Sequence, residues 1–143
     1  MRIRRVFAGL AAVLGAPVFA APVPAQPEPA PPPALHEVRY TVTADRPYFA
    51  RIYYREREPA VFSDYSHNPY IFSPKAEVEI GPDRPWVFHT RLADPTMWAM
   101  VVVQSAEDLY AETPGFYCEL AVDGVVVRTN SGPKGALCSI RSW

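Results

Sequence analysis

The last quarter of the chain constrains the fold most strongly, because it combines a hairpin turn with both of the cysteines in the sequence. Residues 116–122 and 125–129 alternate in polarity, and Asp123 and Gly124 join them. This pair of residues accepts the positive φ angles that a type I′ turn requires. The pattern therefore predicts a two-stranded hairpin, followed after a loop by a third strand at 136–140.

The two-residue turn also predicts the register of the hairpin. It places Val122 opposite Val125 and, further from the turn, Glu119 opposite Arg128, where a cross-strand ion pair is expected. The face expected to be buried carries Cys118, Leu120, Val122, Val125 and Val127, and in the third strand it carries Ala136, Cys138 and Ile140. Both sulfur atoms should thus point into one core.

Cys118 and Cys138 allow one disulfide pairing, and they stand 20 positions apart. Closing a loop of this size stabilises a fold by roughly 3 kcal/mol through the unfolded state. The alternative is two buried thiols, which would suit a chain that stays in the reducing cytosol.

The beginning of the chain is typical of an exported protein. Residues 1–5 contain three arginines, and residues 6–20 form an apolar run that ends in Val18-Phe19-Ala20. Such a run is short for a membrane span, so residues 1–20 are interpreted as a signal peptide, with cleavage after Ala20 or Ala25. The alternative is an uncleaved anchor. With cleavage, no stable membrane span remains, and the expected location is secreted or in the cell envelope.

A proline-rich spacer is expected to follow, because residues 21–34 contain seven prolines. Such a composition favours an extended, disordered tether. Without the first five residues, the 14 basic residues fall to 11 against 15 acidic ones. Nucleic acid is therefore not an expected partner, since its binding depends on Lys and Arg that neutralise phosphates. Residues 35–143 form the predicted folded domain.

Period-2 alternation recurs through that domain, and helical periodicity does not. The strands expected from it are 36–44, 48–57, 75–80, 86–92, 96–105, 116–122, 125–129 and 136–140. The most apolar of them, 96–105, should be a central strand covered on both faces. The prediction is an all-β, antiparallel, immunoglobulin-like β-sandwich of about seven to eight strands with one disulfide, with a closed barrel as the alternative.

The run from Cys118 to Val127, then Ser131-Gly132, then Cys138, resembles the end of the small mycobacterial membrane proteins of the MmpS family. The resemblance implies a small disulfide-bearing extracytoplasmic β-sandwich. It also implies an accessory role beside the large MmpL exporters, which move siderophores and lipids. The chain departs from that family in its cleavable signal, its proline spacer and the inserted aromatic sequence at 59–74.

That inserted segment is the candidate binding surface. It carries Phe62, Tyr65, His67, Tyr70 and Phe72 within a long loop rich in proline and polar residues. Aromatic side chains offer rigid contact area to a lipid, glycan or protein. Alternatively, these side chains close one end of the sandwich as part of its core.

A second feature lies on the strand before this loop. A mixed aromatic and basic stripe is formed by Phe49, Arg51, Tyr53 and Arg55. The long loop could cover this stripe, or the stripe could be a docking edge.

No catalytic or metal-binding pattern stands out. Asp64, Ser66 and His67 are neighbours in sequence, but a catalytic triad is recognised by its geometry in space. The three histidines lack the close spacing of zinc ligands. The expectation is a non-enzymatic protein with no cofactor and no metal, an envelope binding or accessory module whose partner is a transporter or a lipid-type ligand. The alternative is a soluble carrier of a small hydrophobic ligand.

Overall fold

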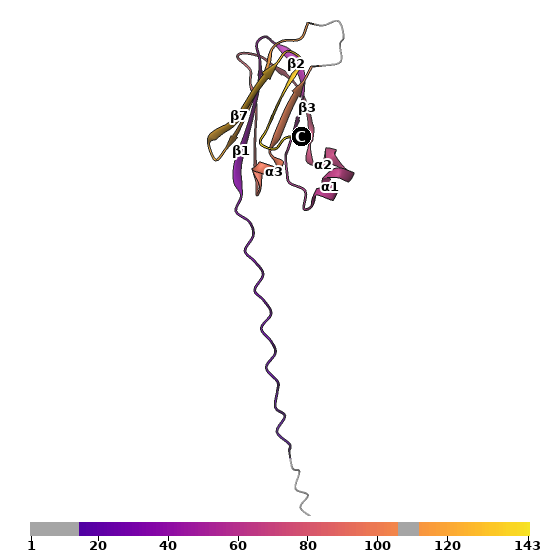
Figure 1. Cartoon of the computed structure of the whole chain (residues 1–143), viewed down its shortest axis with the longest axis vertical. Coiled ribbons are helices and arrows are strands. Elements are labelled where there is room, and N and C mark those ends of the chain that lie inside the picture. The colour runs from indigo at the N-terminus through magenta and orange to yellow at the C-terminus, as the bar shows by residue number, and fades with distance from the viewer. Residues whose placement is uncertain (1–14, 106–111) are drawn as a thin grey trace, which may run out of the picture. The chain divides into compact units, whose positions relative to one another are not determined.

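The computed structural model describes residues 15–105 and 112–143 (Figure 1). The chain divides at Pro31 into two units, and the second, Pro32–Trp143, holds every described helix and strand. Most of the predicted signal peptide, residues 1–14, lies outside the described residues. Residues 15–35 have no regular secondary structure, and their side chains are exposed.

Two four-stranded sheets form the second unit, and every strand pairing within them is antiparallel. The first sheet has the order β4-β1-β6-β7, with bounds Trp86–Leu92, His36–Ala44, Phe116–Val122 and Val125–Gly132. The second has the order β3-β2-β5-β8, with bounds Lys75–Ile80, Tyr48–Tyr54, Met100–Gln104 and Gly135–Ser139. The predicted β-sandwich is therefore confirmed, and the barrel alternative is wrong because the strands form two separate sheets.

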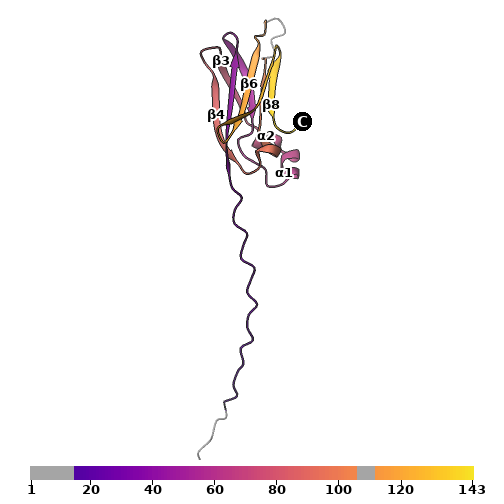
Figure 2. The same ribbon diagram turned by 60° about the vertical axis from the view of Figure 1, so that its left-hand side comes forward.

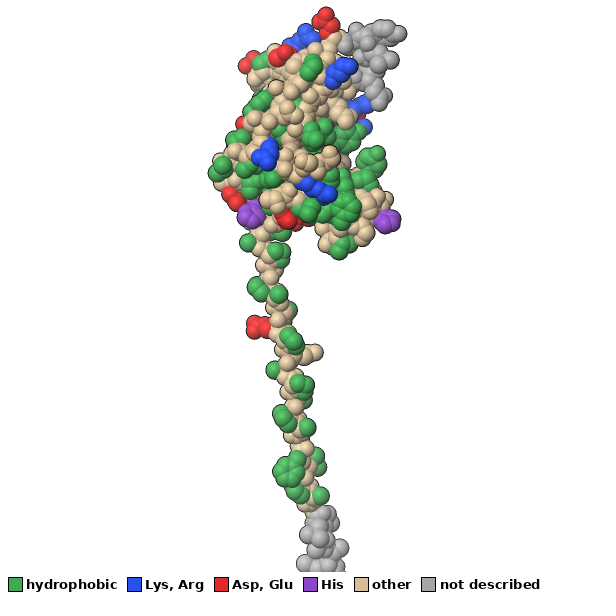
Figure 3. Space-filling view, in the orientation of Figure 1, with side chains coloured by type: hydrophobic (Ala, Val, Ile, Leu, Met, Phe, Trp, Pro, Cys, Tyr) green, Lys and Arg blue, Asp and Glu red, His purple; other side chains and the backbone are tan. Residues whose placement is uncertain are grey.

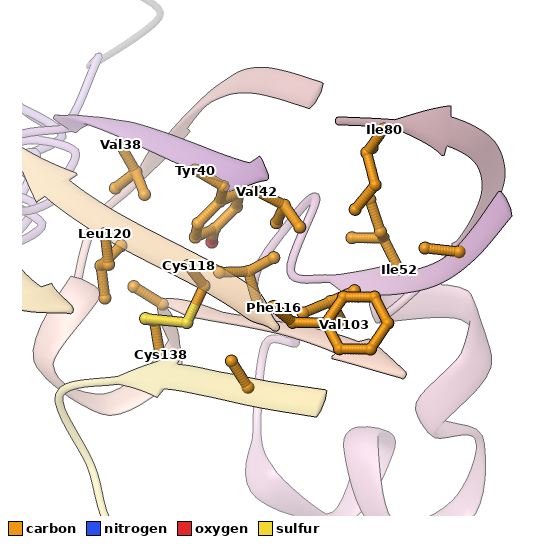
Figure 4. Close-up of a cluster of buried hydrophobic side chains, with 14 of the residues drawn as sticks. Val38, Tyr40, Val42, Ile52, Ile80, Val103, Phe116, Cys118, Leu120 and Cys138 are labelled. Carbon is orange, nitrogen blue, oxygen red and sulfur yellow. A yellow bond between two sulfur atoms is a disulfide. The ribbon is translucent and has the colours of Figure 1, made fainter. Parts of the chain in front are cut away.

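The two sheets lie face to face (Figure 2), and the buried side chains of the core lie between them (Figure 4). Alternation places Val38, Tyr40 and Val42 of β1 inward, where they are fully buried. The facing sheet contributes Ile52 and Val103. Each strand thus buries one face, which is the arrangement that a period-2 sequence pattern demands.

A disulfide between Cys118 and Cys138 crosses this core (Figure 4). Cys118 lies on β6 in one sheet and Cys138 on β8 in the other, and their Cα atoms are 6.0 Å apart. The predicted pairing is confirmed, and the bond joins the two sheets. Because such bonds persist in oxidising compartments, the disulfide indicates an environment outside the cytosol.

The hairpin turn is as predicted, but the register beyond it is not. Asp123 and Gly124 both have positive φ, 50° and 81°. A β-bulge follows between Leu120 and Ala121, so Leu120, not Glu119, pairs with Arg128. The expected Glu119–Arg128 ion pair is therefore wrong.

Two further details of the hairpin follow from its position in the first sheet. Glu119 accepts instead from Arg39 of β1, across the adjacent strand pair, at 3.0 Å. Val125 was expected on the buried face, yet 63% of its surface is exposed. It begins β7, which lies at the edge of its sheet, directly after the hairpin turn.

The predicted central strand 96–105 begins later than expected. Residues Pro95–Trp98 form a helical turn, α3, and the strand β5 starts at Met100. Proline at the first helical position and the Asp94 carboxylate, which accepts from the Met97 amide, favour this turn. The turn places Trp98 at the end of the sandwich, outside the β-sheet ladder.

Candidate binding surface around Arg55

The segment predicted as a long loop contains two short helices, α1 at Phe62–His67 and α2 at Pro69–Phe72. Proline opens α2, which suits its fixed φ angle. Figures 1 and 2 both place these helices together at one end of the sandwich. In the space-filling view, apolar side chains gather over the same region (Figure 3). Regular hydrogen bonding thus replaces the expected irregular loop.

The five predicted surface residues have different surroundings. Phe62 is half exposed, and its ring stacks on that of Trp98. Tyr65 is partly buried and packs against the core. Tyr70 is 74% exposed. These three residues are close in sequence, but their surroundings differ. Phe62 and Tyr65 pack in a cluster, whereas Tyr70 lies at an open rim.

The remaining two predicted residues are held locally. The Nδ1 atom of His67 lies 2.6 Å from the carbonyl oxygen of Ser63, one turn earlier in α1. The Ser66 hydroxyl donates to the same oxygen. Phe72 lies under the guanidinium of Arg57, at 5.4 Å. The side chains of Ser66 and His67 therefore both contact the backbone of their own helix, and not each other.

Arg55 is the residue at the centre of this region. It directly follows β2, and none of its surface is exposed. Its guanidinium carbon lies 4.4 Å from the ring centroid of Tyr65, 5.5 Å from Trp98 and 5.6 Å from Trp143. Cation–π contacts of this kind stabilise a cation that has lost its water. The loop therefore covers the Arg55 end of the predicted aromatic and basic stripe.

Hydrogen bonds satisfy part of the Arg55 guanidinium. Nε donates to the Trp98 carbonyl oxygen at 3.2 Å, and Nη1 donates to the Ser73 hydroxyl at 2.7 Å. Nη2 is buried and has no hydrogen-bond partner among the described residues. No carboxylate of residues 15–105 or 112–143 forms a salt bridge with this guanidinium. The site is thus a buried positive charge with unused donor capacity.

The backbone of Arg55 is fixed from the core side. The Tyr40 hydroxyl donates to the Arg55 carbonyl oxygen at 3.0 Å, and burial raises the pKa of Tyr40 well above its ordinary value. The Arg55 amide donates to the Met100 carbonyl oxygen at 2.9 Å. The neutral phenol and the adjacent strand hold the arginine where the three rings surround it.

A second arginine, Arg141, shares the Trp143 ring with Arg55. The Arg141 guanidinium is 4.7 Å from the ring centroid of Trp143 and 5.5 Å from that of Phe62. Its Nη1 atom is 3.1 Å from the Met97 sulfur. Phe62, Met97 and Trp143 are each at least 40% exposed. These three side chains with Arg141 are here called the aromatic surface.

A groove of about 340 Å³ opens beside α1 and α2 on the outer face of the second sheet. Its floor is formed by side chains from neighbouring strands, Tyr53 of β2 and Met100, Val102 and Gln104 of β5. Its wall is formed by the helices and the residue that follows them, with Tyr65, Pro69, Tyr70 and Ser73. Ser73 and Tyr65 are also direct contacts of Arg55.

Sequence reasoning missed Arg55, Trp98 and Trp143 as members of the cluster. Trp98 was assigned to a strand, and Trp143 stood beyond the last predicted strand. Arg55 carried a weak signal, because it continued the alternating stripe. Its burial could not be inferred without knowing that the helices fold back over the end of β2.

Within residues 15–105 and 112–143, no three His, Cys, Asp or Glu side chains are grouped as metal ligands. No helix in the same ranges is long and apolar enough to cross a membrane.

The fold and this end of the molecule define a small, disulfide-bridged β-sandwich with an exposed aromatic surface. A family model described as the Rv2576c beta-sandwich domain matches residues 40–138, and the chain belongs to this family. Similar proteins include the uncharacterized protein Rv2576c of Mycobacterium tuberculosis (strain ATCC 25618 / H37Rv) and the uncharacterized protein Mb2606c of Mycobacterium bovis. Each is 32% identical over 111 residues, which cover 78% of this chain and 70% of the relative.

Proposed function

We propose that the chain is an exported, non-enzymatic module of the cell envelope that binds another envelope component through its aromatic surface. One observation carries the proposal. Phe62, Met97 and Trp143 remain exposed although their rings and sulfur contact Arg141 and the buried cluster beneath. Apolar side chains held rigidly at a surface are typical of interaction sites.

The proposed partner classes are an envelope transporter and a lipid-type ligand. The disulfide supports a role outside the cytosol. The resemblance of residues 118–138 to the MmpS family supports an accessory role beside an MmpL-type exporter.

The test is affinity capture of the tagged chain from envelope extracts of a mycobacterial host. Wild-type protein is expected to enrich a transporter or a lipid, and the double variant Phe62→Ser/Trp143→Ser is expected to lose this enrichment by roughly tenfold or more. Tyr117→Ser, on the exposed face of β6, is the matched control and should capture normally. Repeated capture by wild type of neither a transporter nor a lipid would contradict the proposal.

The second candidate function is a soluble carrier of a small hydrophobic ligand. The groove at Tyr53, Tyr70 and Val102 favours it, because its volume is near the lower end of the range for small-molecule pockets. Native mass spectrometry of protein from the host should then show a bound ligand. A spectrum with apo protein alone would argue against this function.

A further inference from the structure

We infer that the groove between α2 and the outer face of β5 binds an amphiphile with a carboxylate head, and that Arg55 and Ser73 receive the carboxylate. The inference deepens the carrier function proposed above and rests on it. It concerns different residues from the aromatic surface, so the two can fail separately.

The positive charge of Arg55 is not balanced by a carboxylate of the described residues. A buried cation is costly unless it is paired, and this one has cation–π contacts and two hydrogen bonds but no carboxylate partner among the described residues. Its Nη2 atom is left with no acceptor in the same part of the chain. An anion would supply both the missing charge and the missing acceptor.

The guanidinium of Arg55 contacts the wall of the groove. Nη1 of the same guanidinium reaches the Ser73 hydroxyl at 2.7 Å, and Ser73 lines the groove. Nη1 and Nη2 branch from one carbon, so the donor without an acceptor is the neighbour of the atom that contacts this groove residue. The ring of Tyr65, also a groove residue, covers the guanidinium at 4.4 Å, so the inference requires this ring to move when the head binds.

The wall of the groove offers a second donor, the hydroxyl of Ser73. Ser73 is buried, and its oxygen accepts from Arg55, so the hydroxyl proton is available to a second acceptor. The Ser73 hydroxyl and the guanidinium of Arg55 thus lie next to each other as two donors. Two donors beside a positive charge suit the two oxygens of a carboxylate.

The floor of the groove suits the apolar part of such a ligand. Met100 and Val102 lie on the outward face of β5, and Tyr53 pairs with Val102 across the strands. Tyr70, on α2, forms the open rim. An acyl chain placed along this floor would bury apolar surface that water now contacts, which favours binding.

The experiment is calorimetric titration of the full chain with decanoate, decanol, decyl phosphate and acetate. Decanoate should bind at least about tenfold more tightly than decanol, because hydrogen bonds to a charged group add that much. Acetate alone should show no saturable binding. Equal affinity for decanoate and decanol would overturn the inference and leave Arg55 a purely structural residue. Tighter binding of decyl phosphate would overturn the carboxylate assignment.

Three variants locate the site. Ser73→Ala should weaken decanoate binding by about tenfold and leave decanol unchanged, a difference that a general loss of stability would not produce. Val102→Trp should abolish binding of both by filling the floor, whereas Tyr117→Ala, on the other sheet, should affect neither. Unchanged decanoate affinity in both Ser73→Ala and Val102→Trp would overturn the inference, whatever the capture experiment on the aromatic surface shows.

Discussion

Arg55 has a full positive charge and no exposed surface, and the rings of Tyr65, Trp98 and Trp143 surround its guanidinium. Moving an ion of this kind from water into a protein interior costs several kcal/mol. Ring faces and the Trp98 carbonyl oxygen offset part of that cost. A residue held at this cost, with one donor atom that has no acceptor among residues 15–105 and 112–143, is a natural place for an anionic ligand.

Tyr40 tests how the core holds this arginine. In Tyr40→Phe, the buried Arg55 carbonyl oxygen loses its 3.0 Å hydrogen bond, so the free energy of unfolding should fall by about 1 to 3 kcal/mol. Urea denaturation measures the change. The control is Tyr117→Phe, whose exposed hydroxyl contacts Glu119 at 3.4 Å and whose loss should cost less than about 0.5 kcal/mol. Equal losses of unfolding free energy in Tyr40→Phe and Tyr117→Phe would contradict a stabilising role for the Tyr40 hydrogen bond.

Asp123 gives a prediction about pH. The hydrogen bond with His36, at 2.7 Å, and that from the Glu37 amide hold the pKa of Asp123 below its ordinary value of 3.8. The ionised carboxylate therefore stabilises the fold above that ordinary pKa, and this contribution is lost as pH falls through the lower folded pKa.

Carbon-13 NMR titration of the Asp123 carboxyl should show the lowered pKa in the wild-type chain. His36→Ala should move the pKa of Asp123 upward, toward the ordinary value, because the principal hydrogen bond is removed. His67→Ala, on α1, should leave it in place. A pKa that does not respond to His36→Ala would show that the histidine has no part in the shift.

At the scale of secondary-structure elements, the disulfide is a covalent link between two strands. It joins β6 of one sheet to β8 of the other across 20 positions of sequence. Because β7 and the loop after it lie within the closed segment, the bond limits how far these elements can separate when the chain unfolds. It thus acts on the unfolded chain more than on the packing of the core.

Replacing both Cys118 and Cys138 by alanine should lower the free energy of unfolding by roughly 3 kcal/mol, the amount expected for a loop of this length. Thermal or urea unfolding under non-reducing conditions gives the measurement. Reduction of wild-type protein should produce a similar loss. If the double variant and the wild type unfold at the same denaturant concentration, the bond contributes nothing to stability.

The short helices differ from the strands in what holds them. α1 has six residues and none is buried, so its own hydrogen bonds cannot maintain it in water. Contacts of Phe62 and Tyr65 with Trp98 hold it against α3. The aromatic surface therefore depends on elements that are stable only when packed together.

At the scale of the whole molecule, the chain divides into Met1–Pro31 and Pro32–Trp143. The core and the disulfide belong to the second unit. A chain that starts at Pro32 should therefore keep the melting temperature of the chain that starts at Ala21. A chain that starts at Asp45, which lacks β1, should fail to fold because β1 lies between β4 and β6. Lower stability of the first truncation would mean that the spacer packs on the domain.

The strand predictions succeeded where burial alternates along the chain. The expected 36–44, 75–80, 86–92 and 116–122 agree with the observed strands at both ends. In these strands, up to the bulge in β6, side chains alternate between more and less buried positions, so the local pattern contains the information needed. The prediction of one continuous strand at 96–105 failed, since the same apolar residues suit a helical turn that begins at Pro95.

The candidate site was only partly accessible from sequence. Phe62, Tyr65 and Tyr70 stood out because aromatic residues are unusual in a segment rich in proline and polar residues. Their partners Trp98 and Trp143 come from distant positions, and the burial of Arg55 depends on where α1 and α2 fold back. No local pattern encodes a contact of that kind.

The sequence by itself determined the alternating strands, the type I′ turn at Asp123-Gly124 and the pairing of two cysteines, because each depends on neighbouring residues or on simple counting. The tertiary structure alone decided the sheet in which each strand lies, the bulge after Leu120, and the enclosure of Arg55 by three rings. The physical reason is that these features arise from the packing of segments far apart in the chain, where the free energy of burial outweighs local preference.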